Sequence, residues 1–183
     1  YTASPVFLTG SDESWKLYSL PVKMMLKDNA DDVKALVENP GPKHPFISRV
    51  IKEAESITNR FAKGAVFDAQ HLPLSEIPHH FDEIFIALHG RPGEDGSLQR
   101  RLDVLELPYN GSGADSSATT INKFETNRIL REKGFLVANH ELVQKSAWLT
   151  QGPSLSESLC SEFGLPLIAK PADDGCSAAV RKI

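Results

Sequence analysis

The feature that most constrains the fold of this chain is the stretch from Phe81 to Gly113, where the apolar pattern changes its period across one polar loop. Residues 83–88 form an apolar run of strand length. This run stops at His89-Gly90, where the sequence turns to arginine, proline, glycine and acids. We therefore predict a strand that ends on a polar loop.

A helix is predicted to follow this loop. Leu98, Leu102 and Leu105 are spaced so that they share one helical face. Glu94 and Asp95 precede them, and acidic side chains suit the positive end of a helix. We expect the helix to begin near these two acids and expect both to be structural.

His89 occupies a position that α/β proteins use for ligands. In an open parallel sheet, ligands bind outside the carboxyl ends of the strands, where a loop leads into the next helix. A purely structural alternative stays open, in which His89 hydrogen-bonds its own loop and the glycines serve only the turn, because short motifs often match by chance.

Composition places the chain among ordinary globular proteins. Its 183 residues, 40% hydrophobic and 24% charged, suffice for one large domain or two small ones. The formal net charge of −4 argues against a nucleic-acid binder or an anionic-membrane binder, whose surfaces are basic. Cys160 and Cys176 match neither a disulfide framework nor a zinc spacing, and no signal peptide or spanning apolar run is found. We expect a cytoplasmic protein, with this chain as part of a longer polypeptide.

The N-terminal residues predict strands and helices in alternation. Residues 5–9 form a strand-like run, residues 28–38 a short helix, and residues 45–61 an amphipathic helix that should pack on a sheet or a neighbouring helix. Val66-Phe67 is a candidate strand or extended segment. With the strand at 83–88, these elements predict a layered α/β domain with a mostly parallel sheet.

A metal site at His71, His79 and His80 is a weak alternative for this region. Adjacent histidines point in divergent directions, and no cysteine or further spaced ligand joins them.

The elements after Gly113 follow a different pattern, in which helices come first and two strands close the chain. They are predicted as a connector or short helix over 114–122, a helix over 121–133 that Gly134 ends, a strand over 140–144, a helix opened by a Ser154–Glu157 capping box, and two antiparallel strands over 166–170 and 178–183.

Two lysines stand at positions suited to binding an anion. Lys123 opens the connecting helix, and Lys170 ends a strand before the glycine-containing loop 174–177. A long ammonium side chain can reach a phosphate, and a glycine turn can aim consecutive backbone amides at it. The spacing is not that of a Walker-type loop. The alternative is that both lysines are solvated surface residues and that the loop is only a turn.

Several motifs in order carry a more specific signal. The sequence HGRPGEDGSLQ is followed by PYNGSG, by INK at the head of a helix, and by GLPLIAKPADDGCSAAVRKI. Taken together, these motifs resemble the N-terminal half of D-alanine-D-alanine ligases of the ATP-grasp superfamily. The resemblance is close from about Phe85 to Ile183 and weak over residues 1–80.

The resemblance implies a role for each matching residue. His89, with Gly90, would lie at the substrate site and help to orient the first D-alanine. Lys123 and Lys170 would contact ATP phosphates, and the backbone amides of Asp174, Gly175, Cys176 and Ser177 would close over them. The implied reaction phosphorylates the carboxylate of one D-alanine, and the amine of a second attacks the acyl phosphate.

The chain also departs from the family pattern. Cys176, a candidate substrate-binding residue, stands where the first serine of Glu-Gly-Ser-Ser is usual, and in the family this serine supports a hydrogen-bond network near the substrate. A thiol is a weak donor and acceptor, so we expect it to support that network less well. Ala179 replaces a usual glycine, and Arg100 a usual small residue. The glycine-rich loop with the family's substrate-binding glutamate has no counterpart here, and the magnesium ligands would lie beyond Ile183.

We therefore expect a Rossmann-like pre-ATP-grasp domain over residues 1–115, followed by the start of an α+β ATP-grasp domain over 116–183. The expected ligands are ATP, Mg²⁺ and D-alanine, with no nucleic acid and no membrane as partner and a homodimer as the assembly that the family suggests. We expect a ligase acting in peptidoglycan precursor synthesis, although this segment alone should be inactive. Two alternatives stay open: an ATP-grasp ligase for another amino acid, and a binding or regulatory module that lost the chemistry.

Overall fold

The structure is a computed structural model that describes residues 2–10, 14–26, 29–39, 44–61, 68–175 and 179–183. The candidate strand Val66-Phe67 and the loop residues Cys176 and Ser177 lie outside these ranges. The chain divides into two compact units, Tyr1–His80 and Phe81–Ile183, which are described separately below. The expected domain boundary near residue 115 stays a prediction.

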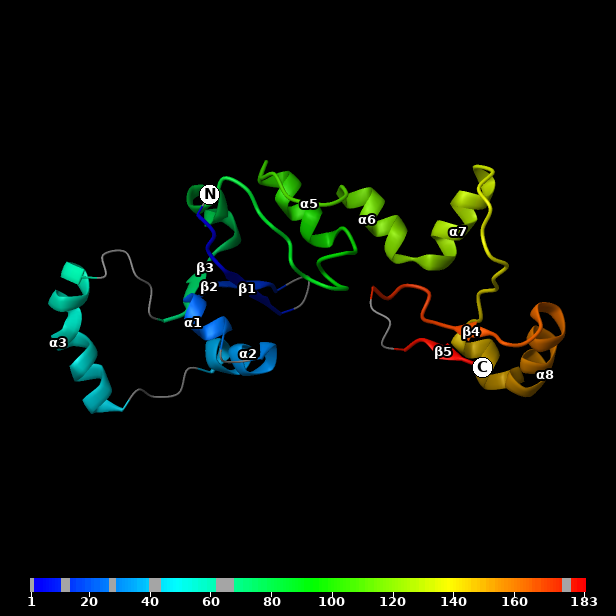
Figure 1. The fold of residues 1–183 in the computed structure, drawn as a ribbon, viewed down its shortest axis with the longest axis horizontal. Coiled ribbons are helices and arrows are strands. Elements are labelled where there is room, and N and C mark those ends of the chain that lie inside the picture. Colours follow the sequence, from blue (N-terminus) through cyan, green and yellow to red (C-terminus); the bar gives the residue numbers. More distant parts are fainter. Residues whose placement is uncertain (1, 11–13, 27–28, 40–43, 62–67, 176–178) are drawn as a thin grey trace. The chain divides into compact units, whose positions relative to one another are not determined.

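The first unit is built on a three-stranded sheet of order β1-β2-β3 (Figure 1). The strands are β1 (Val6–Thr9), β2 (Lys16–Ser19) and β3 (Gln70–Leu72). The strand predicted at 5–9 is therefore confirmed, whereas β2 was not foreseen.

The direction of strand pairing corrects one expectation. β1 pairs with β2 and β2 with β3 in antiparallel register, so the expected mostly parallel arrangement is wrong for this sheet. A short connection between β1 and β2 explains the direction, because a parallel crossover needs a dozen or more residues. The mixed α/β class itself is confirmed.

The helices of the first unit follow local signals. They are α1 (Val22–Met25), α2 (Ala30–Glu38), α3 (Pro45–Phe61), the 3₁₀ turn η1 (Leu74–Glu76) and α4 (Ile77–His80).

Helix α2 is capped at its start and packed along one face. The Asn29 side chain accepts hydrogen bonds from the amides of Asp31 and Asp32, at 2.9 and 3.0 Å. Val33 and Val37 are buried with Leu20 in one apolar cluster, against which Phe7 and Tyr18 of the sheet also pack. Helix α2 therefore covers the sheet.

Helix α3 confirms the predicted helix but not its predicted packing. Ile47 is 49% exposed, Val50 42% and Phe61 74%. The apolar spacing of 45–61 determined the helix, because that is a local property, but it did not determine what covers its apolar face.

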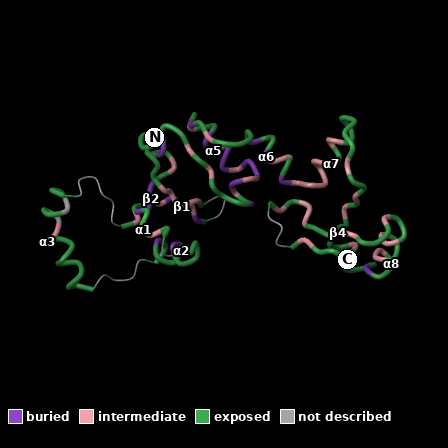
Figure 2. Tube along the Cα trace, in the orientation of Figure 1, coloured by how far each residue is buried: buried purple, intermediate pink, exposed green. Residues whose placement is uncertain are grey.

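The second unit is mainly helical. It contains α5 (Ser97–Val104), α6 (Ala114–Ile121), α7 (Lys123–Glu132), α8 (Lys145–Phe163) and the short strands β4 (Ile168–Ala169) and β5 (Arg181–Lys182). Its buried residues gather around α5 and α6, shown in purple in Figure 2. Leu102 is 1% exposed, and Leu98, Leu107 and Ile121 are also buried.

The strand predicted at 83–88 is wrong as a ladder element. Only Ile84 forms a bridge, in parallel with Tyr109. At Ile86 the partner is a side chain, because the Ile86 amide donates to Asn110 Oδ1 at 2.6 Å and the Ile86 carbonyl accepts from Asn110 Nδ2 at 3.3 Å. A side-chain amide thus takes the place of a neighbouring strand.

The helix predicted after this run is present, with its start moved. It begins at Ser97 rather than near Glu94-Asp95, and Leu98 and Leu102 are buried as their spacing predicted. The two acids precede the helix and hold the loop before it.

The remaining expectations for this unit are mostly confirmed. The short helix over 114–122 is α6, the connecting helix is α7, and β4 pairs with β5 in antiparallel register. No strand is assigned over 140–144 within the described chain. The Ser154–Glu157 capping box is wrong, because α8 starts earlier, kinks at Gln151, and its Ser154 hydroxyl donates to the Gln151 carbonyl at 3.0 Å.

Among the described residues, no helix is both long and apolar enough to cross a lipid bilayer.

Candidate functional site

The loop of residues 89–95 is closed by a reciprocal pair of hydrogen bonds. The Gly90 amide donates to Glu94 Oε2 at 2.7 Å, and the Glu94 amide donates to the Gly90 carbonyl at 2.8 Å. Gly90 is buried, so both bonds satisfy backbone groups that would otherwise be costly to bury. Glu94 is therefore structural, as its place before α5 predicted.

Asp95 anchors the other end of this loop. Its carboxylate accepts from the Ser97 amide at 3.0 Å and from the Ser97 hydroxyl, and it pairs with Arg91. Burial raises the pKa of Asp95, but the bonds from Ser97 and the charge of Arg91 outweigh burial, so the pKa lies below its usual value. Asp95 is thus an ionised, buried carboxylate at the start of α5.

Gln99 ties the same loop to the first turn of α5. Its Nε2 donates to the Gly93 carbonyl at 2.6 Å, and the residue is 4% exposed. The loop before α5 is consequently held by its own Glu94 and Asp95 side chains and by Gln99 of α5.

His89 points into solvent at the edge of this loop. Its side chain is 95% exposed, and its Nδ1 lies 4.0 Å from Glu94 Oε1. An exposed imidazole beside a fixed carboxylate can meet a ligand, and it is not used to hold the described fold together. The contact with Glu94 lies within the loop of residues 89–95, so the alternative in which His89 serves only its own loop stays open.

Lys123 contacts the loop that follows Lys170. The Lys123 amide donates to the Ala172 carbonyl at 2.6 Å, and its ammonium donates to the Asp174 carbonyl. The start of α7 and residues 172–174 are therefore adjacent, although they are far apart in the sequence. Asn122 caps α7 by accepting from the Glu125 amide at 2.9 Å, which fixes the start of the helix.

The same loop also contacts the His89-Gly90 segment. A Cβ atom built on Gly175 would lie 2.6 Å from Gly90 Cα and closer still to Glu94 Oε2, so only a glycine permits this approach. The second unit thus brings together three of the predicted segments: His89-Gly90, Lys123 and residues 174–175.

Lys170 is exposed at the end of β4, two residues before Ala172. Lys123 contacts the carbonyl of Ala172 in the same loop, and the Lys170 side chain forms no ion pair within the described ranges. Cys176 and Ser177 lie outside the described residues, so their predicted roles are not addressed by the structure. The ligand roles of all these residues stay predictions.

Sequence reasoning missed Arg91 and Asp173. The Arg91 guanidinium contacts Asp95 Oδ2 at 3.0 Å and both the carboxylate and the carbonyl of Asp173 at 3.5 Å. No local pattern signals a contact between residues this distant in sequence. The sequence offers one indication of this contact, which is that Arg91 directly follows the His89-Gly90 motif.

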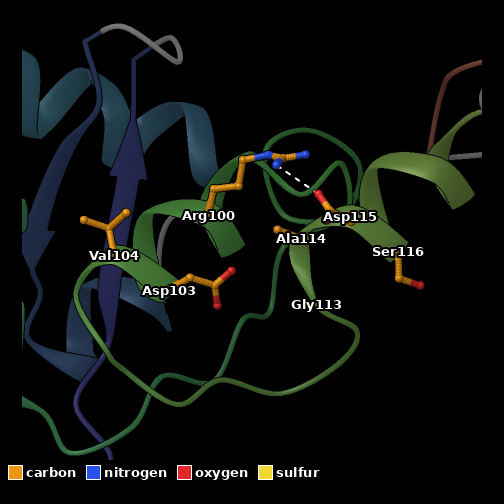
Figure 3. Close-up of a pocket in the computed structure, with 7 residues that line it drawn as sticks. All are labelled: Arg100, Asp103, Val104, Gly113, Ala114, Asp115 and Ser116. Carbon is orange, nitrogen blue, oxygen red and sulfur yellow. Dashed lines mark ion pairs between the residues drawn. The ribbon is translucent and has the colours of Figure 1, made fainter.

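A separate hollow of about 540 Å³ lies between α5 and the start of α6 (Figure 3). The Arg100 guanidinium pairs with Asp115 across it at 3.0 Å. None of the predicted site residues line it; its lining consists of Arg100, Asp103, Val104, Gly113, Ala114, Asp115 and Ser116. Arg100, which departs from the usual small residue, thus lies outside the candidate site.

No group of three or more histidine, cysteine or acidic side chains is placed to hold a metal ion among the residues that the structure describes. His71, one member of the weak histidine alternative, instead packs edge-on against the Tyr18 ring at 5.5 Å.

Comparison with known proteins identifies the family. The family model described as D-ala D-ala ligase N-terminus matches residues 1–112. The chain belongs to this D-ala D-ala ligase N-terminal family. The match includes the residues before 81, where the sequence motifs alone were weak.

Relatives named D-alanine--D-alanine ligase extend the similarity. One from Polynucleobacter asymbioticus is 44% identical over 104 residues, covering 56% of this chain and 28% of the relative. One from Acidovorax ebreus is 35% identical over 130 residues, covering 70% of this chain and 37% of the relative. The chain therefore spans about a third of the length of these curated relatives.

A solved structure shares the fold. The D-alanine-D-alanine ligase from Coxiella burnetii matches with a TM-score of 0.55 and 26% identity, covering 92% of this chain and 43% of that structure. The similarity thus reaches beyond residue 112.

Proposed function

We propose that the protein containing this chain is an ATP-dependent ligase that joins two D-alanines through an acyl-phosphate intermediate, for peptidoglycan precursor synthesis in the cytoplasm. The observation that carries the proposal is the convergence of His89-Gly90, Lys123 and residues 172–175 in a chain of this family. Because the chain spans about a third of its relatives, the activity is proposed for the longer protein.

ATP supplies the phosphoryl group that activates a carboxylate. The residues present fit the triphosphate of ATP, because two lysines flank a glycine-containing loop. An ammonium group carries three donors, and the contact of Lys123 with the Asp174 carbonyl uses one of them. Lys123 can therefore hold the loop and a phosphate together, with Lys170 as the second cation.

The backbone of Asp174, Gly175, Cys176 and Ser177 would supply amide donors to the same phosphates. Glycine at 175 supports this role twice, since it frees the backbone and lets the loop approach Gly90. In this proposal the loop also shields the acyl phosphate from water, a task that needs a closed and positioned segment.

His89 would bind the first D-alanine beside this loop. Its exposed imidazole has its Nδ1 atom 4.0 Å from Glu94 Oε1. A hydrogen-bonding imidazole can stabilise the charge that develops on the substrate carboxyl group. Magnesium ligands are proposed outside this chain.

The proposal is tested by ATP-dependent phosphate release in the full-length protein, with D-alanine, other D-amino acids and D-lactate offered separately. Release with D-alanine together with dipeptide formation supports it. Release only with another acceptor indicates a ligase of different substrate, which the cysteine at position 176 keeps open. Absence of nucleotide binding indicates a binding or regulatory module instead.

A pair of lysine variants tests the phosphate site. Lys170→Ala should raise the KM for ATP about tenfold or more, since a hydrogen bond to a charged group is worth about 1.5–3 kcal/mol. Lys145→Ala is the control. Lys145 is exposed, as Lys170 is, but it lies at the start of α8 and has no proposed role in binding ATP. Equal effects of the two variants would count against the role of Lys170.

A further inference from the structure

Two loops of the second unit are held against each other by one arginine. The Arg91 Nη1 atom donates to Asp95 Oδ2 at 3.0 Å, and Nη2 donates to the carboxylate and the carbonyl of Asp173 at 3.5 Å each. A planar guanidinium presents several donors in fixed directions, so one arginine can bind two partners at once.

The two ends of this bridge differ in rigidity. The Asp95 side chain is 4% exposed and is fixed by Ser97, whereas the Asp173 side chain is 66% exposed on its loop. Arg91 is thus anchored on the buried carboxylate and reaches out to the exposed one. Arg91 therefore links the fixed start of α5 to the exposed loop that contains Asp173.

Arg91 also differs from the lysines proposed to bind phosphate. Its charge faces two carboxylates, Asp95 and Asp173, which neutralise it. Among the described residues, the partners of Lys123 in the same loop are the carbonyl oxygens of Ala172 and Asp174. A ligand phosphate would therefore compete for Lys123, while the Arg91 contacts would persist.

We propose that Arg91 is a positioning residue that holds the loop 171–175 against the His89-Gly90 loop and so sets the place of the phosphate-binding amides relative to the substrate histidine. The inference rests on the proposed function for its consequence in catalysis. Its structural part, a loop held by Arg91, rests only on the contacts of Arg91 and on the close approach of Gly175 to Gly90.

The experiment compares Arg91→Ala with Arg100→Ala in the full-length protein. These arginines are matched, since their side chains are 55% and 57% exposed and each forms an ion pair at 3.0 Å. Amide hydrogen exchange of residues 172–175 is measured without nucleotide. Arg91→Ala should speed this exchange about three- to fivefold, as expected for loss of a partly exposed charge pair, and Arg100→Ala should leave it unchanged.

Steady-state kinetics supply the second measurement. Arg91→Ala should raise the KM for ATP by about the same three- to fivefold factor and leave the KM for D-alanine unchanged. The reason is that the variant displaces the backbone amides of the loop 171–175, which are proposed to bind phosphate, and leaves His89 in place. Arg91→Lys should recover only part of the loss, because an ammonium lacks the second arm that reaches Asp173.

The outcomes separate this inference from the proposed function. Equal exchange in Arg91→Ala and Arg100→Ala would overturn the inference, as would faster exchange with an unchanged KM for ATP. Full recovery by Arg91→Lys would also contradict it. Failure of the wild-type protein to bind ATP would overturn the proposed function and the catalytic consequence, while the exchange comparison would still decide whether Arg91 holds the loop.

Discussion

Replacement of Gly96 by alanine should destabilise the second unit more than any other single methyl addition at its helix ends. Gly96 precedes α5 with a φ of 84°, in the left-handed region. A Cβ atom built there would lie well inside 3.0 Å of the Ala114 carbonyl oxygen, a separation that real Cβ atoms essentially never show. It would also lie 3.2 Å from the Ala118 amide nitrogen. Both atoms belong to the α6 backbone, so neither can rotate away.

The magnitude has two parts, and a second glycine separates them. Gly134 has the same φ of 84°, but a Cβ atom built on it would meet nothing within 4 Å. Gly134→Ala should therefore lose only the left-handed penalty of about 1–2 kcal/mol. Gly96→Ala should lose this penalty and about 1–3 kcal/mol more, because α5 and α6 must move apart to admit the methyl group.

The assay is amide hydrogen exchange on the full-length protein, read separately for peptides from α5–α6 and from α7. Gly96→Ala should lower the opening free energy of the α5–α6 peptides, and Gly134→Ala that of the α7 peptides, by the amounts given above. Equal losses in the two variants would refute the reasoning, because the close approach of Gly96 to α6 would then contribute nothing.

Three further predictions concern the same unit, each checked by urea unfolding of the full-length protein. Glu106→Gly should stabilise by about 1 kcal/mol, since Glu106 has a φ of 55° at the end of α5, where glycine carries no steric penalty; an unchanged midpoint would contradict this. Asp95→Asn should destabilise at pH 7, and because the folded pKa of Asp95 is lowered, the difference from wild type should be complete above about pH 4 and shrink as the pH falls through the folded pKa; a difference that grows toward low pH would show the opposite sign. Leu102→Ala, at 1% exposure, should destabilise by about 2–5 kcal/mol. Val104→Ala, at 82% exposure in the same helix, is its control and should change stability little.

Local features of this chain could be predicted from the sequence. The start of α7 at Lys123, its end before Gly134 and the buried face of α5 were predicted from helix-forming residues, a terminal glycine and apolar spacing. These signals act within a few residues, so no knowledge of the fold is needed to use them. The α/β class followed from the same signals summed over the chain.

Long-range features could not be predicted in this way. The direction of the β1–β2 pairing depends on the connection between two short strands, and β2 itself has too few apolar residues to be noticed. The run 83–88 has the composition of a strand but finds only one bridge, at Ile84. The composition of a segment indicates whether it can form a strand, but the strand that pairs with it depends on the whole fold.

The candidate site shows the same division. Its motif residues were found because their order in the chain resembles a family, and the family match supports that resemblance. The contact between Arg91 and Asp173 was not predicted, because the two residues are 82 positions apart and neither was among the predicted site residues. A motif identifies residues that touch a ligand more readily than residues that hold those residues in place.

The arginines and lysines of the second unit differ in whether they pair with carboxylates. Arg91 and Arg100 pair with Asp95 and Asp115 at 3.0 Å, and Arg128 pairs with Glu125 and Glu132. Lys123 and Lys170 form no such pair among the described residues, although both lie at the loop 171–175. Arginine suits a fixed, two-armed contact to a carboxylate, and lysine suits a mobile charge that can exchange a carbonyl for a phosphate. Of these arginines, Arg91 therefore fits the task of building the site, and in the proposed function the two lysines bind an anionic ligand within it.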